Sequence, residues 1–254
     1  SVNGMNKGAR VLDVTVDSSY SANFRQKTIL NPALTLPPSS TGNVTMTLQN
    51  TGNEPASWSF GAYFDDSLWS LSDLEWFDSA GAPITQISVD KAETVEVIAQ
   101  LTAPVQATPG TVEITLLTNA VPPASAQSTW KIYVDVPIVT DLTMSALSNE
   151  ITVPSNGQPQ QIEIGFVNNG NSDENYNLSI LADFRLQASL SSVETGVMDA
   201  FGGDTVTYVL LPMPFGLPPD VYLIDVKATS QTDPSYNVVQ QIRLNVPPTY
   251  EVVV

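Results

Sequence analysis

Apolar residues recur at every second position in many short segments of this chain. In residues 43–49, NVTMTLQ, the side chains of Val44, Met46 and Leu48 alternate with polar ones, and residues 162–166 follow the same pattern. A period of two is typical of β-strands that have one face in a core and the other in solvent. The pattern therefore predicts a chain built from short strands.

A turn of the form Asn-x-Gly-Asn follows both of these strands. It is NTGN at 50–53 and NNGN at 168–171, and each turn leads into an alternating strand with a large aromatic residue, Trp58 or Tyr176. Gly and Asn tolerate the positive φ angles that turns require. Each stretch predicts a strand-turn-strand corner that brings its aromatic side chain into the core.

The two corners belong to a longer internal repeat. Three pairs of segments match in the same order in both copies: 50–53 with 168–171, 93–95 (ETV) with 204–206 (DTV), and 132–137 with 242–247. Several matches in one order indicate tandem units with the same fold. The shift between the copies shrinks along the chain because the first copy has the longer middle.

Each copy predicts about seven short strands, the number typical of an immunoglobulin-like sandwich. Sustained helical periodicity is absent, and residues 65–77, DDSLWSLSDLEWF, predict at most a single helical turn. The fold class that follows is all-β, with two immunoglobulin-like β-sandwiches in tandem. Because the chain contains no cysteine, packing alone must stabilise the two cores.

The repeat also predicts the domain organisation. We place the first sandwich at 31–137 and the second at 138–247, with a joint so short that it predicts a semi-rigid connection. Residues 1–30 form an N-terminal extension with an alternating strand inside 8–24. Residues 248–254 match the entry of the second copy, which predicts a terminal strand or the start of a further domain.

Composition narrows the functional classes. Asp and Glu number 26 against 9 Lys and Arg, a net charge of −17, which repels nucleic acids and anionic membranes. Neither histidine nor cysteine is present, so the usual general base and the commonest transition-metal ligands are missing, and we expect no catalytic residues. No apolar run is long enough to span a membrane. The chain opens with Ser1, so we expect a part of a longer exported protein whose signal and anchor lie elsewhere.

The order of these motifs resembles that of the Ig-like domains of bacterial and archaeal cell-surface proteins. TPGTVEITLLT at 108–118 and PPDVYLIDVKAT at 218–229 complete the pattern, which is nearest to CARDB-type, cell-adhesion-related domains and to the Ig-like domains associated with α-galactosidases. The resemblance covers 31–247. It implies non-catalytic spacers, adhesive modules or assembly subunits at the cell surface. One departure is Asp220, which stands where the first copy has Gly110, and it puts the geometry of that turn in doubt.

The first copy contains an acidic insertion, residues 63–84, with clustered oxygen ligands of the kind that Ca²⁺ prefers. Its carboxylates are Asp65, Asp66, Asp73, Glu75 and Asp78. The alternative is an ordinary solvated loop. Residues 169–175, NGNSDEN, are another possible cation loop, for which the alternative is turn chemistry. The pairs Asp65/Asp66 and Glu75/Asp78 have the residue types of a glycosidase acid and base, but the sequence places neither pair across a cleft.

Three aromatic residues of the same insertion, Trp69, Trp76 and Phe77, suggest a stacking platform for sugar rings or a partner protein. The alternative is that some of them cover an open end of the sandwich. A ligand of this class would make the chain an adhesive module rather than a spacer.

Two sequons for N-glycosylation occur, at Asn43 (NVT) and Asn177 (NLS). Both lie on predicted strands beside the core-facing Val44 and Leu178, so both asparagines should point to solvent. That is the face on which a glycan can be attached.

We therefore expect a structural segment of an exported surface protein, either a semi-rigid spacer or a subunit that assembles head-to-tail. In the second case the strand inside 8–24 would pair with the sheet edge of a neighbouring copy, whereas the alternative is that it folds onto its own domain. We expect no cofactor, with Ca²⁺ in the acidic insertion as the alternative. The remaining alternatives are a glycan- or protein-binding adhesive module and an accessory region of a secreted hydrolase.

Overall fold

The computed structural model describes residues 16–153, 158–212 and 217–248. Regular structure in this part is β-strand apart from two single 3-10 turns, η1 (Leu71–Asp73) and η2 (Phe184–Leu186). The all-β prediction is confirmed, and the single helical turn predicted inside 65–77 is η1.

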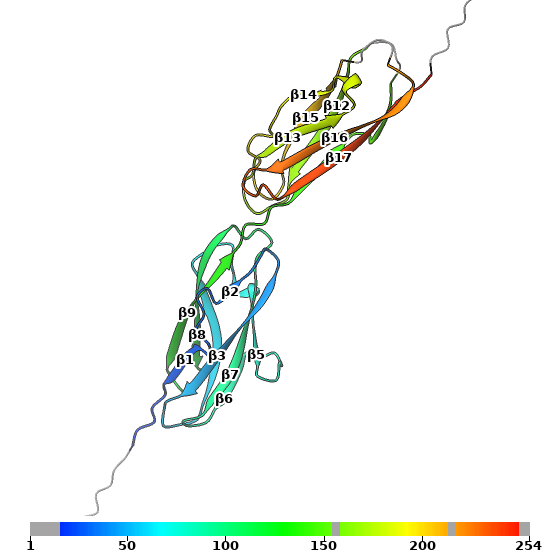
Figure 1. Cartoon of the computed structure of the whole chain (residues 1–254). Helices are drawn as coiled ribbons and strands as arrows, with labels where there is room; N and C mark the ends of the chain where they lie inside the picture. The colour runs from blue at the N-terminus through cyan, green and yellow to red at the C-terminus, as the bar shows by residue number, and fades with distance from the viewer. Residues whose placement is uncertain (1–15, 154–157, 213–216, 249–254) are drawn as a thin grey trace, which may run out of the picture. The chain divides into compact units, whose positions relative to one another are not determined.

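The chain divides into two compact units, each with two sheets (Figure 1). Proximity of Cα atoms groups Asp135 and the residues after it into the second unit, together with the short segments 35–40 and 103–111. The predicted boundary at Pro137 stays a prediction.

Strands of the first sandwich form a four-stranded and a five-stranded sheet. The four-stranded sheet has the order β1 (Ala22–Gln26), β3 (Thr41–Asn50), β7 (Thr94–Thr102), β5 (Leu74–Asp78). The five-stranded sheet has the order β2 (Leu34–Thr35), β9 (Gln127–Val136), β8 (Gly110–Ala120), β4 (Ala56–Phe64), β6 (Gln86–Val89).

The second sandwich repeats this order with two four-stranded sheets. One is β10 (Leu142–Ala146), β12 (Gln160–Asn168), β15 (Gly203–Leu211), β14 (Ser189–Leu190). The other is β11 (Glu150–Thr152), β17 (Asn237–Val246), β16 (Asp220–Ser230), β13 (Tyr176–Ala182). In both units the chain switches between sheets in the manner of an immunoglobulin-like sandwich, which confirms the predicted fold class.

Alternation along the strands places the cores between the sheets. In the second unit one hydrophobic cluster joins Ile164 of β12 to Ile224 of β16 and Leu244 of β17, on the opposite sheet. Trp58 and Tyr176, the aromatic residues that follow the two Asn-x-Gly-Asn turns, are both fully buried, as predicted. Burying such side chains removes a large apolar area from water and dominates the stability of a sandwich that lacks disulfides.

The N-terminal strand lies later in the chain than expected. β1 begins at Ala22, and it pairs antiparallel with β3 of its own sandwich, Phe24 facing Leu48. This is the alternative to strand donation. Residues 1–15 and 249–254 lie outside the described residues, so the earlier part of the predicted N-terminal strand and the predicted terminal strand remain predictions.

The departure at Asp220 is resolved without strain. Gly110 has a φ of 145°, whereas the non-glycine residues with positive φ in the described chain are Ser39, Ala92, Gln187 and Phe201. Asp220 therefore starts β16 with an ordinary φ, and its Oδ1 accepts a hydrogen bond from the Val221 amide at 2.8 Å.

Candidate functional site

The first asparagine of each Asn-x-Gly-Asn turn is fully buried and organises the turn. Asn168 Oδ1 accepts from the Gly170 amide at 3.0 Å, while Nδ2 donates to the carbonyls of Ser172 at 2.9 Å and Met198 at 3.1 Å. An asparagine amide that accepts from the residue two positions later forms an Asx turn. Because the oxygen and the NH₂ group of the Asn168 side chain are both hydrogen-bonded, these bonds offset the cost of burying this polar side chain.

Asn50 repeats these bonds in the first sandwich. Its Oδ1 accepts from the Gly52 amide at 3.0 Å, and its Nδ2 donates to the carbonyls of Glu54 at 2.9 Å and Val89 at 3.0 Å. The turn is thus fixed to a distant part of the same sandwich in both copies.

The last asparagine of each turn binds the chain that enters its sandwich. We call Asp17–Ser21 and Pro137–Asp141 the entry segments. Asn171 Oδ1 accepts from the Val139 amide at 2.7 Å, its Nδ2 donates to the Pro137 carbonyl at 3.0 Å, and its own amide donates to the Val139 carbonyl at 3.2 Å. The side chain is 2% exposed.

Asn53 makes the same three bonds to the first entry segment. Its Oδ1 accepts from the Ser19 amide at 2.7 Å, its Nδ2 donates to the Asp17 carbonyl at 2.9 Å, and its amide donates to the Ser19 carbonyl at 3.1 Å. The sequence predicted turn geometry for both asparagines, and a possible cation loop around Asn171, but no contact with the entry segments. The missed signal was that this second asparagine recurs in both copies, although an Asx turn requires only the first.

The glycine of each turn permits close approach of the entry segment. A Cβ on Gly170 would lie 2.5 Å from the Val139 carbonyl oxygen, and a Cβ on Gly52 would overlap the Ser19 carbonyl oxygen. Both glycines are needed because the two backbones are in direct contact. The site contains neutral amides and backbone groups, so its chemistry is to hold a peptide segment.

The acidic insertion does not gather its carboxylates. Among the described residues, no group of three or more acidic side chains is placed to hold a metal ion. Four carboxylates accept from nearby backbone amides instead: Asp65 from Glu113, Asp66 from Leu68, Asp73 from Ser70, and Asp78 from Ala80 and Ala82. Glu75 lies exposed on β5. The Ca²⁺ site stays a prediction without geometric support. In the glycosidase-type pairs Asp65/Asp66 and Glu75/Asp78, the three aspartates accept from backbone amides and Glu75 is exposed to solvent.

Burial separates the three aromatic residues of the insertion. Trp69 and Trp76 are 4% and 8% exposed, whereas Phe77 is half-buried. Trp76 stacks on Phe60 with ring centroids 4.7 Å apart, and Trp69 stacks on Phe64 at 6.3 Å. The tryptophans thus cover the core, which was the alternative to a platform, and ligand binding by these residues stays a prediction.

A groove of about 670 Å³ lies beside this stack in the first sandwich. Trp76, Phe77 and Ile84 give it an apolar wall, and Glu75 and Thr85 add polar groups. Its volume is in the range of small-molecule sites.

Both sequon asparagines lie where the sequence predicted. Asn43 and Asn177 are exposed, and the residues that follow them, Val44 and Leu178, are buried. Each asparagine Oδ1 accepts from a glutamine side chain, Gln100 for Asn43 and Gln231 for Asn177. Attachment of a glycan stays a prediction. In residues 169–175 the Asn and Gly take part in the turn, which supports the turn interpretation of that loop.

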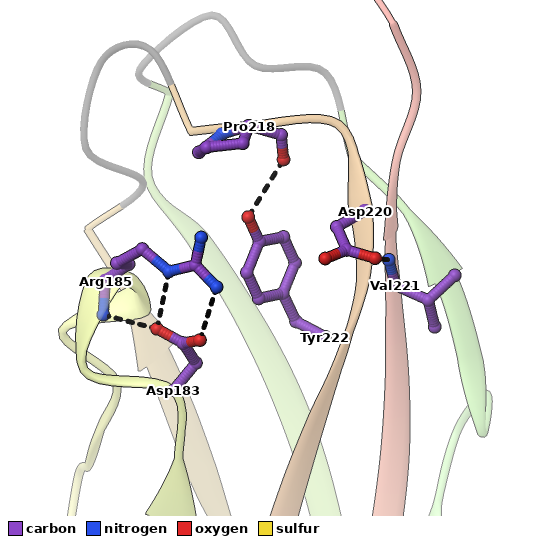
Figure 2. A network of polar contacts seen from close by, with 6 residues as sticks. All are labelled: Asp183, Arg185, Pro218, Asp220, Val221 and Tyr222. Carbon is purple, nitrogen blue, oxygen red and sulfur yellow. Dashed lines mark hydrogen bonds and ion pairs between the residues drawn. The ribbon is translucent and has the colours of Figure 1, made fainter.

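Figure 2 shows a polar network in the second sandwich, outside the entry segment. Arg185 donates from Nε to Asp183 Oδ1 at 2.9 Å and from Nη2 to Oδ2 at 2.6 Å, with its guanidinium 5.1 Å from the Tyr222 ring centroid. Tyr222 Oη donates to the Pro218 carbonyl at 2.9 Å. These contacts fix η2 beside β16.

The network predicts a pH effect at Asp183. Hydrogen bonds from the side chain and then the amide of Arg185 lower the pKa of Asp183 from 3.8 to about 2. Since the folded-state pKa lies below the ordinary value, the contribution to stability is present above about pH 4 and is lost as pH falls towards 2. NMR titration of the Asp183 carboxyl should give a midpoint near 2. Arg185→Ala should return the midpoint towards its ordinary value and Arg243→Ala should not; an unchanged midpoint in Arg185→Ala would contradict the assignment.

No family model and no curated protein matches this chain. The similar solved structures include a family 123 glycoside hydrolase from Clostridium perfringens, with a TM-score of 0.34 and 11% identity over 41% of this chain and 22% of the hydrolase chain. Domains 4 and 5 of the S-layer protein SbsC give a TM-score of 0.31 and 14% identity over 75% of this chain and 77% of theirs. The structure of SbsC domains 1–6 gives a TM-score of 0.32 and 14% identity, and the match covers 99% of this chain and 32% of the SbsC chain.

These likenesses are low in both identity and TM-score, and they assign no function. The chain spans about a fifth of the hydrolase chain, 22% of its length. Within the described residues the structure contains no helix that is long and apolar enough to cross a membrane.

Proposed function

We propose that this chain is a non-catalytic structural segment of an exported surface protein, in which sandwich units in tandem hold other parts at a distance. The observation that supports it is the repeated attachment of each entry segment. Asn53 and Asn171 make the same three hydrogen bonds to the chain that enters their sandwiches. A spacer needs ordered joints, and this contact orders the residues that lead into each unit.

The energetic scale suits that role. Net contributions of about 1 kcal/mol per hydrogen bond give about 3 kcal/mol for the bonds of one asparagine, enough to keep an entry segment bound more than nine-tenths of the time. Most of these groups are backbone amides and carbonyls, so the contact does not depend on pH or salt. The net charge of −17 keeps neighbouring copies apart in solution.

Surface location is supported by composition and by the exposed sequons. The chain lacks cysteine and histidine, has few cations and presents Asn43 and Asn177 to solvent. These features fit an exported structural protein better than an enzyme or a nucleic-acid-binding protein.

The test is light scattering of the full chain with and without millimolar Ca²⁺, combined with ¹⁵N relaxation. We expect a monomer of 27.2 kDa in both conditions and equal rotational correlation times for amides of the two units. Two different correlation times would overturn the spacer role. Filaments or layers would establish the alternative of an assembling subunit, with self or a neighbouring surface-protein domain as partner.

An adhesive module is the second candidate, and the groove beside Trp76 favours it. Of Trp69, Trp76 and Phe77, half-buried Phe77 is the residue that a sugar ring or a partner side chain can reach in this groove. Binding on a glycan array that is lost in Phe77→Ala and kept in Phe184→Ala, which removes an exposed phenylalanine of the other sandwich, would establish this function in place of the spacer.

A further inference from the structure

The hydrogen bonds that both turns make with their entry segments all involve backbone atoms of the segments. In each copy the last asparagine binds the amide and carbonyl of the third segment residue, Ser19 or Val139, and the carbonyl of the first, Asp17 or Pro137. The second turn residue adds one more bond to the carbonyl of the fifth, Ser21 or Asp141. No side chain of a segment takes part in this shared set.

The segments themselves differ at every position. The first is Asp-Ser-Ser-Tyr-Ser (17–21) and the second is Pro-Ile-Val-Thr-Asp (137–141). The first has one bond of its own, between the hydroxyls of Ser21 and Thr51 at 2.8 Å. Two segments of different sequence thus bind to the same turn through the same backbone hydrogen bonds.

We propose that the Asn-x-Gly-Asn turn is a peptide-docking site that recognises the backbone of its entry segment and is indifferent to the segment's side chains. Asp17–Ser21 is docked in it as a linker of the same kind as Pro137–Asp141, which joins the two copies. The proposal deepens the proposed function, because it names the site's partner as the linker of a tandem unit.

Backbone recognition gives the site a simple sequence rule. Proline is compatible with the first position, as at Pro137, because only the carbonyl of that residue is used. Proline at the third position removes the amide that donates to the asparagine Oδ1. The second position, where Ile138 is 54% exposed, takes any residue type.

The glycine supplies a second, independent requirement. Because the Val139 carbonyl oxygen lies 2.5 Å from the position that a Cβ of residue 170 would take, the segment backbone packs directly against the turn. Contact of this kind depends on the path of the segment backbone.

The experiment uses the full chain and measures amide exchange by NMR. In the linker-exchange variant, residues 137–141 become those of the first segment: Pro137→Asp, Ile138→Ser, Val139→Ser, Thr140→Tyr and Asp141→Ser. We expect the amides of residues 139 and 171 to stay within about threefold of their protection in the unchanged chain. Val139→Pro should lower protection of the Asn171 amide at least about tenfold, and Val139→Ser, the residue found at the matching place, should not.

Loss of protection in the linker-exchange variant to the level of Val139→Pro would overturn the proposal, because the turn would then depend on side chains. Unchanged protection in Val139→Pro would overturn it as well. Asn171→Ala removes the two side-chain bonds from the other partner, with Asn169→Ala as the neighbouring control, so the test stands even where the proline variant fails to fold. Amide protection reports only the contact between the turn and its segment. It can therefore support docking when unequal correlation times reject the spacer role, and it can reject docking when equal correlation times support that role.

Discussion

Gly170→Ala is expected to lower the free energy of unfolding of the second sandwich by about 2 kcal/mol, because an added methyl group in a fully packed contact forces backbone shifts. Its Cβ would lie 2.5 Å from the Val139 carbonyl oxygen and 3.0 Å from Asn168 Oδ1. Backbone atoms occupy that space, and they cannot rotate away as the end of a side chain can.

The chain provides its own probe for this measurement. All four tryptophans, at 58, 69, 76 and 130, lie in the first copy. Urea unfolding followed by tryptophan fluorescence therefore reports the first sandwich, while NMR signals of the second report the other. Gly170→Ala should shift the second transition alone, and Gly52→Ala should shift the first. Gly165→Ala, whose nearest neighbour is the movable Ser145 hydroxyl at 3.2 Å, is the control and should change stability by less than about 1 kcal/mol. A Gly170→Ala chain as stable as this control would contradict the close contact.

Asn168→Ala should have the larger effect, about 3 kcal/mol, because it removes several hydrogen bonds between a buried side chain and the backbone around it. The Gly170 amide loses its acceptor and the Ser172 carbonyl loses its donor, while the Met198 carbonyl keeps only its bond from the Glu174 amide. Asn168 is fully buried, so water does not replace the lost bonds at the surface. The second sandwich should melt earlier, by roughly 10 °C or more for a unit of this size.

Asn169→Ala is the matched control for this substitution. The neighbouring side chain makes one exposed bond, from Nδ2 to Thr143 Oγ1 at 2.8 Å, and its loss should change stability by less than about 0.5 kcal/mol. Equal melting temperatures for the two variants, measured by circular dichroism, would show that the buried amide does not support the turn. Asn50→Ala should transfer the effect to the tryptophan-monitored transition of the first sandwich.

Much of the fold follows from periodicity. Alternation along β3 and β12 was sufficient to predict which side chains are buried, because a strand between core and solvent has a period of two. The Asn-x-Gly-Asn turns were predicted from local chemistry. Their contact with the entry segments was not, because Asn171 and Val139 lie 32 residues apart and a hydrogen bond to a backbone leaves no trace in the partner's side chain.

The insertion shows where residue types leave alternatives open. Asp66 and Asp78 were candidates for cation ligands, yet each bonds to amides of its own turn, the local alternative that short acidic side chains always have. Trp76 was a candidate for a platform, and its burial depends on Phe60, which the sequence did not place beside it. Residue type alone does not decide between these outcomes.

The same contact holds both entry segments, and amide hydrogen exchange of the unchanged chain measures it in solution. The amides of Ser19 and Val139 donate to the side-chain oxygens of Asn53 and Asn171, so both should exchange at least about tenfold more slowly than the adjacent amides of Ser18 and Ile138. Slow exchange at both places would establish that each sandwich holds its entry segment in solution. Exchange of Ser19 and Val139 as fast as that of their neighbours would contradict the account.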